Sequence, residues 1–216
     1  MEFLERLKKN AYSGLSVADH SIDLHGWVQE GFEKTFQTAL LSAKESPAII
    51  VEVGTWKGLS ASIMARTLKE MRKEAYVICI DTWLGAPEFW TWGIDKPEWG
   101  NSLKLRNGYP SVFETFTKNM KMLGMDDIVV PLPVSSLVGA DILKHYGIKA
   151  DIIYIDAAHE YESVKQDILK FKEIIKPGGT IFGDDYSDFW AGVKRAVDET
   201  LPERIVEGKV WHSKID

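Results

Sequence analysis

The amino-acid sequence predicts an α/β fold: a doubly wound, mostly parallel sheet with helices on both faces. Short, nearly continuous apolar runs such as Ala48–Val53 alternate with segments whose apolar residues recur at helical spacing. Strands that are apolar throughout are typical of parallel sheets covered on both sides. The chain ends in two strand-like runs around Gly208 and Lys209, which predict a hairpin with an antiparallel edge strand. With 216 residues and 45% hydrophobic composition, residues 1–216 are expected to form one domain.

The first half of the chain begins with an expected helical cap over residues 1–45, placed before the first strand. Its last helix ends where Ser46 and Pro47 interrupt the helical pattern. Apolar, β-branched runs that end at Gly54 and Asp81 are expected as strands, and the amphipathic segments after them as helices. In order, the expected elements are helix 30–43, strand Ala48–Val53, helix 58–71, strand Ala75–Ile80 and helix 112–123.

The second half repeats the alternation. Val164, Ile168 and Phe171 lie at helical spacing, and a Lys-Pro-Gly-Gly run after them is expected to stop that helix. In order, the expected elements are strand 128–134, helix 137–145, strand 152–155, helix 161–175, strand 180–183, helix 188–200 and the closing hairpin.

Charge and composition exclude several classes of protein. The formal net charge is −6 and the basic residues are scattered, so binding to nucleic acid or to an anionic membrane is not expected. The single cysteine, Cys79, lies in an apolar run and is expected to be a buried thiol in a reducing compartment. Without an apolar run of membrane-spanning length or a signal-peptide pattern, we expect a cytoplasmic protein.

A glycine turn follows the first expected strand, in VEVGTWKGLS. Gly54 at the strand end and Gly58 at the helix start would let the backbone approach a ligand, and the helix N-terminus would offer free N–H groups. Asp81, at the end of the next strand, is placed to accept hydrogen bonds from ribose hydroxyls. The alternative is a plain structural turn. The pattern also differs from the Gly-x-Gly-x-x-Gly of dinucleotide-binding proteins.

Three carboxylates follow two expected strands in the second half. Asp156 ends the strand at 152–155, and Asp184 and Asp185 end the strand at 180–183. Because parallel strands end at the same sheet edge, these side chains are expected to converge. Unpaired carboxylates repel each other unless a cation lies between them, which predicts a site for Mg²⁺ or Mn²⁺. The alternative is that the Asp pair only forms a turn.

These motifs resemble class I S-adenosylmethionine-dependent methyltransferases. The segment YIDAAHEYESVKQDI resembles the small methyltransferase family with the pattern Tyr-Ile-Asp-Gly-x-His-x-Tyr, and also the metal-dependent O-methyltransferases of the catechol and sugar types. The resemblance implies a Rossmann-like methyltransferase sheet, with Asp156, Asp184 and Asp185 as metal ligands. It implies contacts with S-adenosylmethionine from Glu52, Gly54, Thr55, Trp56, Gly58, Ser60, Asp81, Thr82 and Ser136. The catechol type covers the adenine with a Trp where this chain has Ala158, so Thr82 or Trp83 is expected to replace it.

His159 lies three residues after Asp156, where the catechol type carries a lysine base. A histidine titrates near neutrality and could take the proton of an acceptor hydroxyl, with Asp156 as the competing base. Alternatively, His159 caps the following helix or supports a metal ligand.

A tryptophan-rich insertion occupies residues 82–110 and carries Trp83, Trp90, Trp92 and Trp99. Loops of this length are usually functional or disordered, and aromatic content disfavours disorder. We expect a lid over an acceptor pocket, closed on its other side by Trp27, and indole faces suit the apolar faces of a carbohydrate. A dimer contact or a self-packed loop is the alternative.

The resulting expectation is an O-methyltransferase that uses S-adenosylmethionine and Mg²⁺ or Mn²⁺ and acts on a small molecule, plausibly a sugar or glycoside, with a homodimer possible. Three rivals stay open: a nicotinamide-linked oxidoreductase, a hydroxylase-like relative with the same fold and metal, and a non-catalytic cofactor-binding module.

Overall fold

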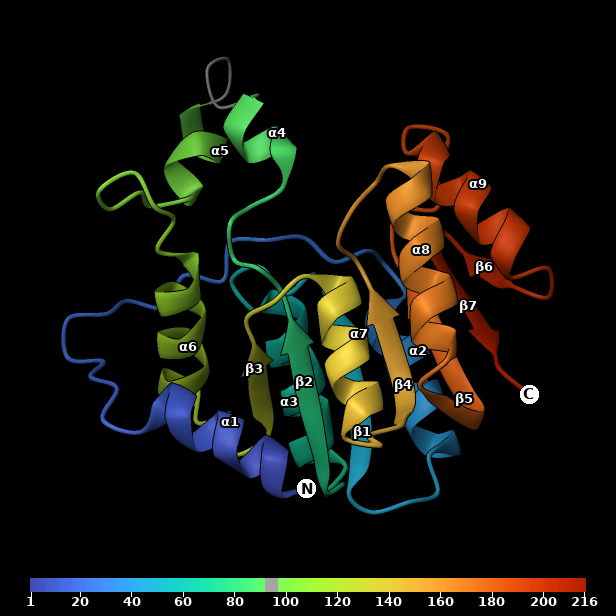
Figure 1. Cartoon of the computed structure of the whole chain (residues 1–216), viewed down its shortest axis with the longest axis horizontal. Coiled ribbons are helices and arrows are strands. Elements are labelled where there is room, and N and C mark those ends of the chain that lie inside the picture. The colour runs from blue at the N-terminus through green and yellow to red at the C-terminus, as the bar shows by residue number, and fades with distance from the viewer. Residues whose placement is uncertain (92–96) are drawn as a thin grey trace.

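The computed structural model describes residues 1–91 and 97–216, so the predicted lid residue Trp92 lies outside the described residues. Figure 1 shows one sheet between two layers of helices. The described strands form a 7-stranded sheet in the order β3-β2-β1-β4-β5-β7-β6. Their bounds are β1 (Ala48–Val53), β2 (Ala75–Ile80), β3 (Val129–Leu132), β4 (Ala150–Ile155), β5 (Ile175–Gly183), β6 (Ile205–Glu207) and β7 (Val210–Lys214).

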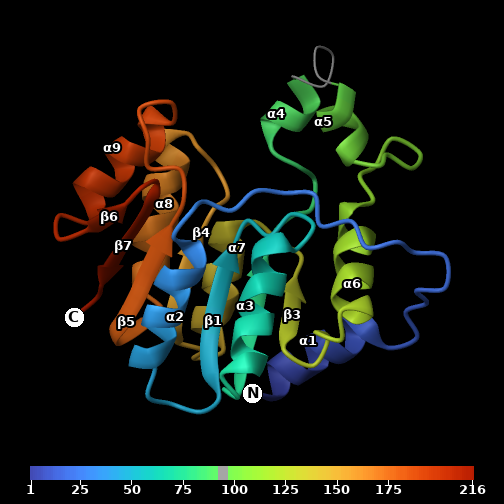
Figure 2. The ribbon, with the colours of Figure 1, turned by 180° about the vertical axis from the view of Figure 1, so that it is seen from behind.

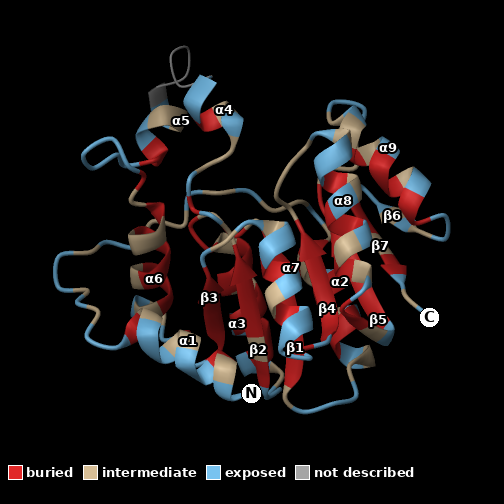
Figure 3. Ribbon diagram, in the orientation of Figure 1, coloured by how far each residue is buried: buried red, intermediate tan, exposed pale blue. Residues whose placement is uncertain are grey.

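The first five strands are parallel, and β7 pairs antiparallel with both β5 and β6. The doubly wound sheet and the closing hairpin predicted from the sequence are therefore confirmed. Every residue of β1 and β4 is buried, because helices cover both faces of the central strands. Figure 3 shows this buried band running through the middle of the molecule.

Two apolar clusters fill the two faces of the sheet. Helices α2, α3 and α6 contribute residues such as Phe36, Met64 and Phe116 to one cluster. In Figure 2, α2 and α3 lie in front of the sheet and α6 lies beside it. Helices α7, α8 and α9 contribute to the other, together with Leu4 of α1. The helix bounds are α1 (Glu2–Tyr12), α2 (Phe32–Ser42), α3 (Leu59–Glu70), α4 (Pro87–Thr91), α5 (Pro97–Ser102), α6 (Val112–Met122), α7 (Ser136–His145), α8 (Tyr161–Lys172) and α9 (Ala191–Thr200).

The sequence predicted that the Lys-Pro-Gly-Gly run would end a helix before the next strand begins. This prediction is wrong. Helix α8 already ends at Lys172, and the run lies inside β5 as a bulge, where the register against β4 shifts. Gly178 has a φ of 78°, and the bulge backbone pairs with Ile215 near the chain end. The glycines therefore allow the strand to bend around the bulge. Helix α9 begins at Ala191, three residues later than predicted, after an irregular turn.

Two segments lie over the carboxyl ends of the parallel strands. The segment between α1 and α2 crosses this edge of the sheet, and α4 and α5 stand above it (Figures 1 and 2). None of the helices in the described ranges has the length and apolar content that crossing a membrane would require.

Candidate active site

A cavity of about 720 Å³ opens at the carboxyl edge of the sheet. Its wall combines strand ends, the loops after them, the N-terminal segment and the insertion. The lining residues are Gly26, Trp27, Gln29, residues 53–56, Leu59, Ser60, residues 80–82, residues 85–89, Trp99, residues 134–137, residues 156–160, Ser163, Gln166, Asp167, Asp184, Asp185, Phe189, Trp190 and Lys209. Ligands of open α/β sheets bind at this edge, so the cavity is the candidate active site.

The glycine turn brings the ends of β1 and β4 together. Gly54 has a φ of 85°, and a Cβ added to it would lie 2.1 Å from the carbonyl oxygen of Asp156. Only glycine combines this conformation with this close approach. The turn therefore sets the distance between the predicted cofactor loop and the first carboxylate.

Asp81 is fixed by backbone amides. Its Oδ2 accepts hydrogen bonds from the N–H groups of Thr55 (2.9 Å) and Trp56 (2.8 Å), and its Oδ1 accepts one from Trp83 N–H (2.7 Å). Burial raises the pKa of this carboxyl, and the backbone hydrogen bonds oppose that rise. The side chain is thus oriented before any ligand arrives.

Two residues predicted to contact the cofactor do not line the cavity. Glu52 is fully buried and accepts hydrogen bonds from Thr55 Oγ1 (2.9 Å), Cys79 Sγ (3.2 Å) and the Ser60 hydroxyl. Burial raises its pKa to about 7, although these hydrogen bonds favour the charged form. It supports the turn from below. Gly58 faces α6 instead, where an added Cβ would lie 2.7 Å from the Met120 side chain.

The other predicted cofactor residues share the cavity wall: Gly54, Thr55, Trp56, Ser60, Asp81, Thr82 and Ser136. Their contact with S-adenosylmethionine stays a prediction. Trp83 does not replace the missing adenine-covering tryptophan, because it is 1% exposed and packs on Phe113 and Phe116 of α6. Thr82 lines the cavity in its place.

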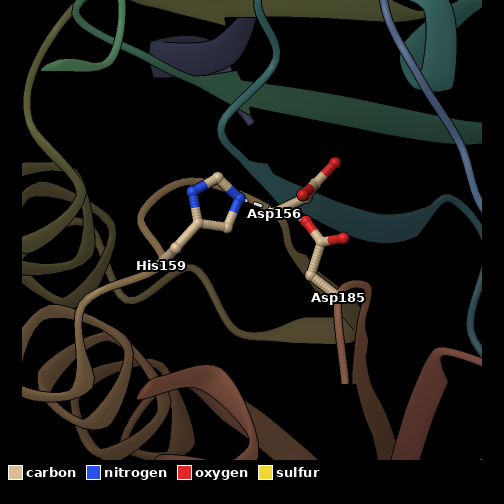
Figure 4. A group of neighbouring side chains, drawn as sticks. All are labelled: Asp156, His159 and Asp185. Carbon is tan, nitrogen blue, oxygen red and sulfur yellow. Dashed lines mark hydrogen bonds and ion pairs between the residues drawn. The ribbon is translucent and has the colours of Figure 1, made fainter. Parts of the chain in front are cut away.

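Three side chains converge at the end of β4, as Figure 4 shows. Asp156, His159 and Asp185 each offer one ligand atom, and these atoms lie within 4.8 Å of one another. His159 Nε2 lies 3.1 Å from Asp185 Oδ2. Carboxylates from β4 and β5 therefore meet, as the sequence predicted, and His159 joins them.

Asp184 lies next to this group but is held differently. The Tyr154 hydroxyl lies 2.9 Å from Asp156 Oδ2 and 3.0 Å from Asp184 Oδ2. The backbone N–H of Gln29 also donates to Asp184 Oδ2 (3.1 Å), while Asp184 Oδ1 is buried and has no hydrogen-bond partner among the described residues. A buried carboxylate oxygen without a partner is costly, so this oxygen is suited to receive a cation or a donor.

The raised pKa values of Asp156 and Asp184 indicate that it is unfavourable for these neighbouring carboxylates to be ionised together. Burial, and then the charges of Asp184 and Asp185, hold the pKa of Asp156 well above its usual range. Burial also raises the pKa of Asp184 to about 6, despite hydrogen bonds from Gln29 and Tyr154. A divalent cation would relieve this repulsion, and the oxygen donors suit Mg²⁺ or Mn²⁺. The residues present thus fit such an ion.

His159 does not cap α8, since the N-cap of that helix has no side-chain hydrogen bond. Its ring stacks on Trp190, with centroids 3.8 Å apart, and its Nδ1 lies 3.8 Å from Glu88 Oε1 of the insertion. No motif in the sequence indicates Gln29, Glu88 or Trp190 as site residues. Tyr154 could have been inferred, because it lies in β4 two residues before Asp156, and side chains two apart in extended chain share a face.

The insertion forms one wall of the cavity. Phe89 stacks on Trp56 of the glycine turn, with ring centroids 4.2 Å apart. Trp99 stacks on Trp27 of the N-terminal segment at 5.2 Å, and both line the cavity. Trp90 is 47% exposed and lies outside this contact. The two segments expected to close over the site therefore meet each other above it.

Comparison with known proteins agrees with this geometry. Residues 51–186 match a protein-family model described as a methyltransferase domain. The uncharacterized protein R132 of Acanthamoeba polyphaga mimivirus is 24% identical over 182 residues, which cover 84% of this chain and 68% of R132.

Two solved structures share the fold at low sequence identity. The O-methyltransferase NovP is 18% identical with a TM-score of 0.63, over 99% of this chain and 98% of NovP. The calicheamicin methyltransferase CalS11 is 14% identical with a TM-score of 0.61, over 99% of this chain and 90% of CalS11. Because the family model spans more than half of the sequence and the sheet has the matching architecture, the chain belongs to the methyltransferase-domain family and is a class I S-adenosylmethionine-dependent methyltransferase.

Proposed function

We propose that this enzyme transfers the methyl group to a hydroxyl of a small molecule, a sugar or glycoside, with the help of a divalent metal ion. The observation that carries the proposal is the meeting of Asp156, Asp185 and His159 beside Asp184 in the wall of the cofactor cavity. A cluster of oxygen donors there suits an ion that binds and orients a hydroxyl.

Two further observations support a carbohydrate acceptor. CalS11 is described as a TDP-rhamnose 3'-O-methyltransferase and NovP as an O-methyltransferase. Part of the cavity wall is aromatic, with Trp27, Trp99 and Phe89 among the lining residues. Aromatic rings pack well on the apolar faces of sugar rings, while the carboxylates beside them serve the hydroxyl groups.

In this proposal Asp156, Asp184 and Asp185 hold the ion. When bound, the ion lowers the pKa of the acceptor hydroxyl and S-adenosylmethionine supplies the methyl group. Tyr154 and Gln29 keep the carboxylates oriented through the hydrogen bonds described above. Trp56 and Phe89 restrict water on the cofactor side of the cavity.

His159 is the group that takes the hydroxyl proton. Its imidazole lies beside these carboxylates, and a neutral ring that donates Nε2–H to Asp185 keeps Nδ1 as the nitrogen that accepts the proton. Trp190 stacks on one face of the His159 ring, and Asp185 pairs with its Nε2, so the ring is held in one orientation. A positioned base contributes typically about 10² to 10⁴ in rate.

A first experiment measures the release of S-adenosylhomocysteine with a panel of nucleotide sugars, glycosides and catechols, with Mg²⁺ or with EDTA. We expect turnover with a glycoside or nucleotide sugar, its loss in EDTA and its return with Mg²⁺ or Mn²⁺. Turnover that is indifferent to EDTA would contradict the metal proposal, and turnover of catechols alone would contradict the carbohydrate proposal.

A second experiment separates metal binding from proton transfer. Asp185→Asn should weaken Mn²⁺ binding by about 10-fold or more, measured by titration calorimetry. His159→Gln should keep Mn²⁺ affinity within a factor of three and lower kcat by about 10² or more. Asp188→Asn is the matched control, because the Asp188 side chain is 91% exposed and pairs only with Lys194 among the described residues. A large loss of Mn²⁺ affinity in His159→Gln would instead make His159 a ligand.

A further inference from the structure

One carboxylate of the insertion lies beside His159 and has no part in the mechanism proposed above. Glu88 of α4 lines the cavity, and its side chain is 13% exposed. Its Oε1 lies 3.8 Å from His159 Nδ1, which is longer than a hydrogen bond. Its Oε2 is buried and has no hydrogen-bond partner among the described residues. Glu88 therefore lacks a donor close to the place where the acceptor hydroxyl is proposed to bind.

The surroundings of Glu88 do not supply a compensating cation. In the part of the wall that the structure describes, Lys209 is the only Lys or Arg, and it is exposed to solvent. The divalent ion of the proposed mechanism is bound by Asp156, Asp184 and Asp185, whose charges together exceed its own. A buried carboxylate without donors is unfavourable, because it has lost water and gained nothing in exchange. Glu88 is therefore suited to a donor on a bound molecule, and best to a positively charged one.

We propose that Glu88 binds a protonated amino group of the acceptor, so that the enzyme prefers amine-bearing sugars or glycosides to their neutral counterparts. The inference rests on the proposed function, because it takes the acceptor hydroxyl to bind beside Asp156 and His159. An ammonium group brings both the charge and the N–H donors that Glu88 lacks. The ring faces of Phe89 and Trp99, in the same cavity wall, also attract cations. A protonated amine has no free electron pair, so the hydroxyl stays the group that receives the methyl.

Other acceptor groups suit Glu88 less well. A neutral hydroxyl would donate one hydrogen bond and leave the carboxylate charge uncompensated. A nucleotide sugar carries a diphosphate, which would bring further negative charge into a cavity whose described wall is rich in Asp and Glu. Among the acceptors of the proposed function, Glu88 therefore favours an amine-bearing glycoside over a nucleotide sugar.

The test measures how matched glucosides bind to the wild-type protein in the presence of S-adenosylhomocysteine and Mg²⁺. Each analogue is a methyl glucoside in which an amino group replaces one hydroxyl, and all ring positions are covered in turn. Each is measured beside methyl glucoside and beside its own N-acetyl form, by saturation-transfer NMR competition at about pH 6.5, where an alkyl amine is protonated. We expect at least one amine to bind about 10-fold or more tightly than methyl glucoside, and its N-acetyl form to lose this gain.

Glu88→Gln tests the residue itself, because it removes the charge with little change of shape. The preference for the amine should fall below about 3-fold, while the affinity for methyl glucoside changes by less than about 3-fold. Glu98→Gln is the matched control, since Glu98 lies in α5 of the same insertion, is exposed and is not among the residues that line the cavity. That variant should keep the wild-type preference. If Glu88 only held His159 in place, Glu88→Gln would affect all the glucosides alike and the preference would persist.

The outcomes are distinct. A wild-type protein that binds none of the amines more tightly than methyl glucoside would overturn the inference, as would an undiminished preference in Glu88→Gln. Preferential binding of an amine without release of S-adenosylhomocysteine from any glycoside would support the role of Glu88 and count against the proposed function. Methyl transfer to neutral and amine-bearing glycosides at equal kcat/KM would do the reverse. Because the first comparison uses the wild-type protein alone, a variant that does not fold leaves the inference falsifiable.

Discussion

At the scale of single residues, Gly54 shows how one backbone position controls the site. An alanine there would adopt a φ of 85° and place its Cβ 2.1 Å from Asp156 O, so β1 and β4 would have to separate. We predict that Gly54→Ala lowers the free energy of unfolding by more than about 3 kcal/mol, as measured by urea denaturation. Gly147 has a φ of 63° with no atom within 4 Å of an added Cβ, so Gly147→Ala should cost only about 1 kcal/mol. Equal costs would show that the close approach does not matter.

Glu52 predicts a dependence of stability on pH. Its pKa is raised from 4.5 to about 7 in the folded protein because the carboxyl is fully buried. The folded protein therefore holds this proton more tightly than the unfolded chain does. The stabilisation is complete below about pH 4.5 and is lost as the pH rises through about 7.

Glu52→Gln removes this titration with little change of shape. We predict that, relative to the variant, the wild-type protein loses about 3 kcal/mol of unfolding free energy between pH 4.5 and 8. Urea denaturation of both proteins across this range measures the difference, and other titrating groups cancel in the comparison. A difference that stays constant with pH would contradict the prediction.

The candidate site residues differ in how well the sequence revealed them. Asp81, Asp156 and Asp185 were predictable because each follows a strand, and parallel strands end at one edge of the sheet. Glu52 was predicted beside the cofactor but does not line the cavity, because the sequence does not tell which side chains near a strand end face the cavity and which face the core. Gln29 could not be predicted, because no motif marks it: its backbone N–H donates to Asp184 and its side-chain amide to Asp185, from a segment far away in the sequence.

At the scale of elements, the N-terminal segment is anchored by a buried ion pair. Lys57 is 2% exposed and its Nζ lies 2.9 Å from Asp23 Oδ2. Asn119 of α6 is fully buried and bonds the carbonyl oxygens of both Asp23 and Lys57. This junction ties the segment that crosses the cavity to the helix after the glycine turn.

We predict that Asp23→Ala costs about 3 kcal/mol of unfolding free energy, because it leaves the Lys57 charge buried without a partner. Lys57→Met should cost less than about 1 kcal/mol, because Asp23 keeps a second partner, Lys104, at 2.7 Å. Urea denaturation of both variants and of the double variant measures this asymmetry. If the double variant is less stable than Asp23→Ala alone, the buried charge is not the cause.

Regular elements were predicted well from the sequence, and irregular ones poorly. The ranges of β1 and β2 were predicted to the residue, because buried parallel strands are apolar throughout. The bulge in β5 was taken for a helix stop, because Pro and two glycines mark both a turn and a bulge. Helices α4 and α5 are too short to show a period, so their sequence predicted only a loop.

At the scale of the whole molecule, the sheet joins both apolar clusters into one structure. Each face of the sheet packs against one of the two clusters. Leu4 near the start of the sequence and Trp211 near its end belong to the same cluster. The single domain expected over residues 1–216 stays a prediction, which the unfolding experiment below tests. A domain of this kind usually unfolds in one cooperative transition.

We predict that S-adenosylhomocysteine at 100 times its Kd raises the stability by about 2.7 kcal/mol and the Tm by about 5 to 10 °C. The physical reason is that the ligand binds only where β1, β2 and β4 are all in place. Differential scanning calorimetry measures both the shift and the number of transitions. A second transition that the ligand does not move would show a part of the molecule that folds independently.

The contacts around Asp184 have a consequence for biosynthesis. Its carboxylate is held by the backbone N–H of Gln29, and its carbonyl oxygen accepts a hydrogen bond from the Trp211 indole. Residues up to Trp211 must therefore have left the ribosome before the acidic pocket can assemble. A nascent chain that stops short of Trp211 would lack one of the contacts that hold Asp184 in place.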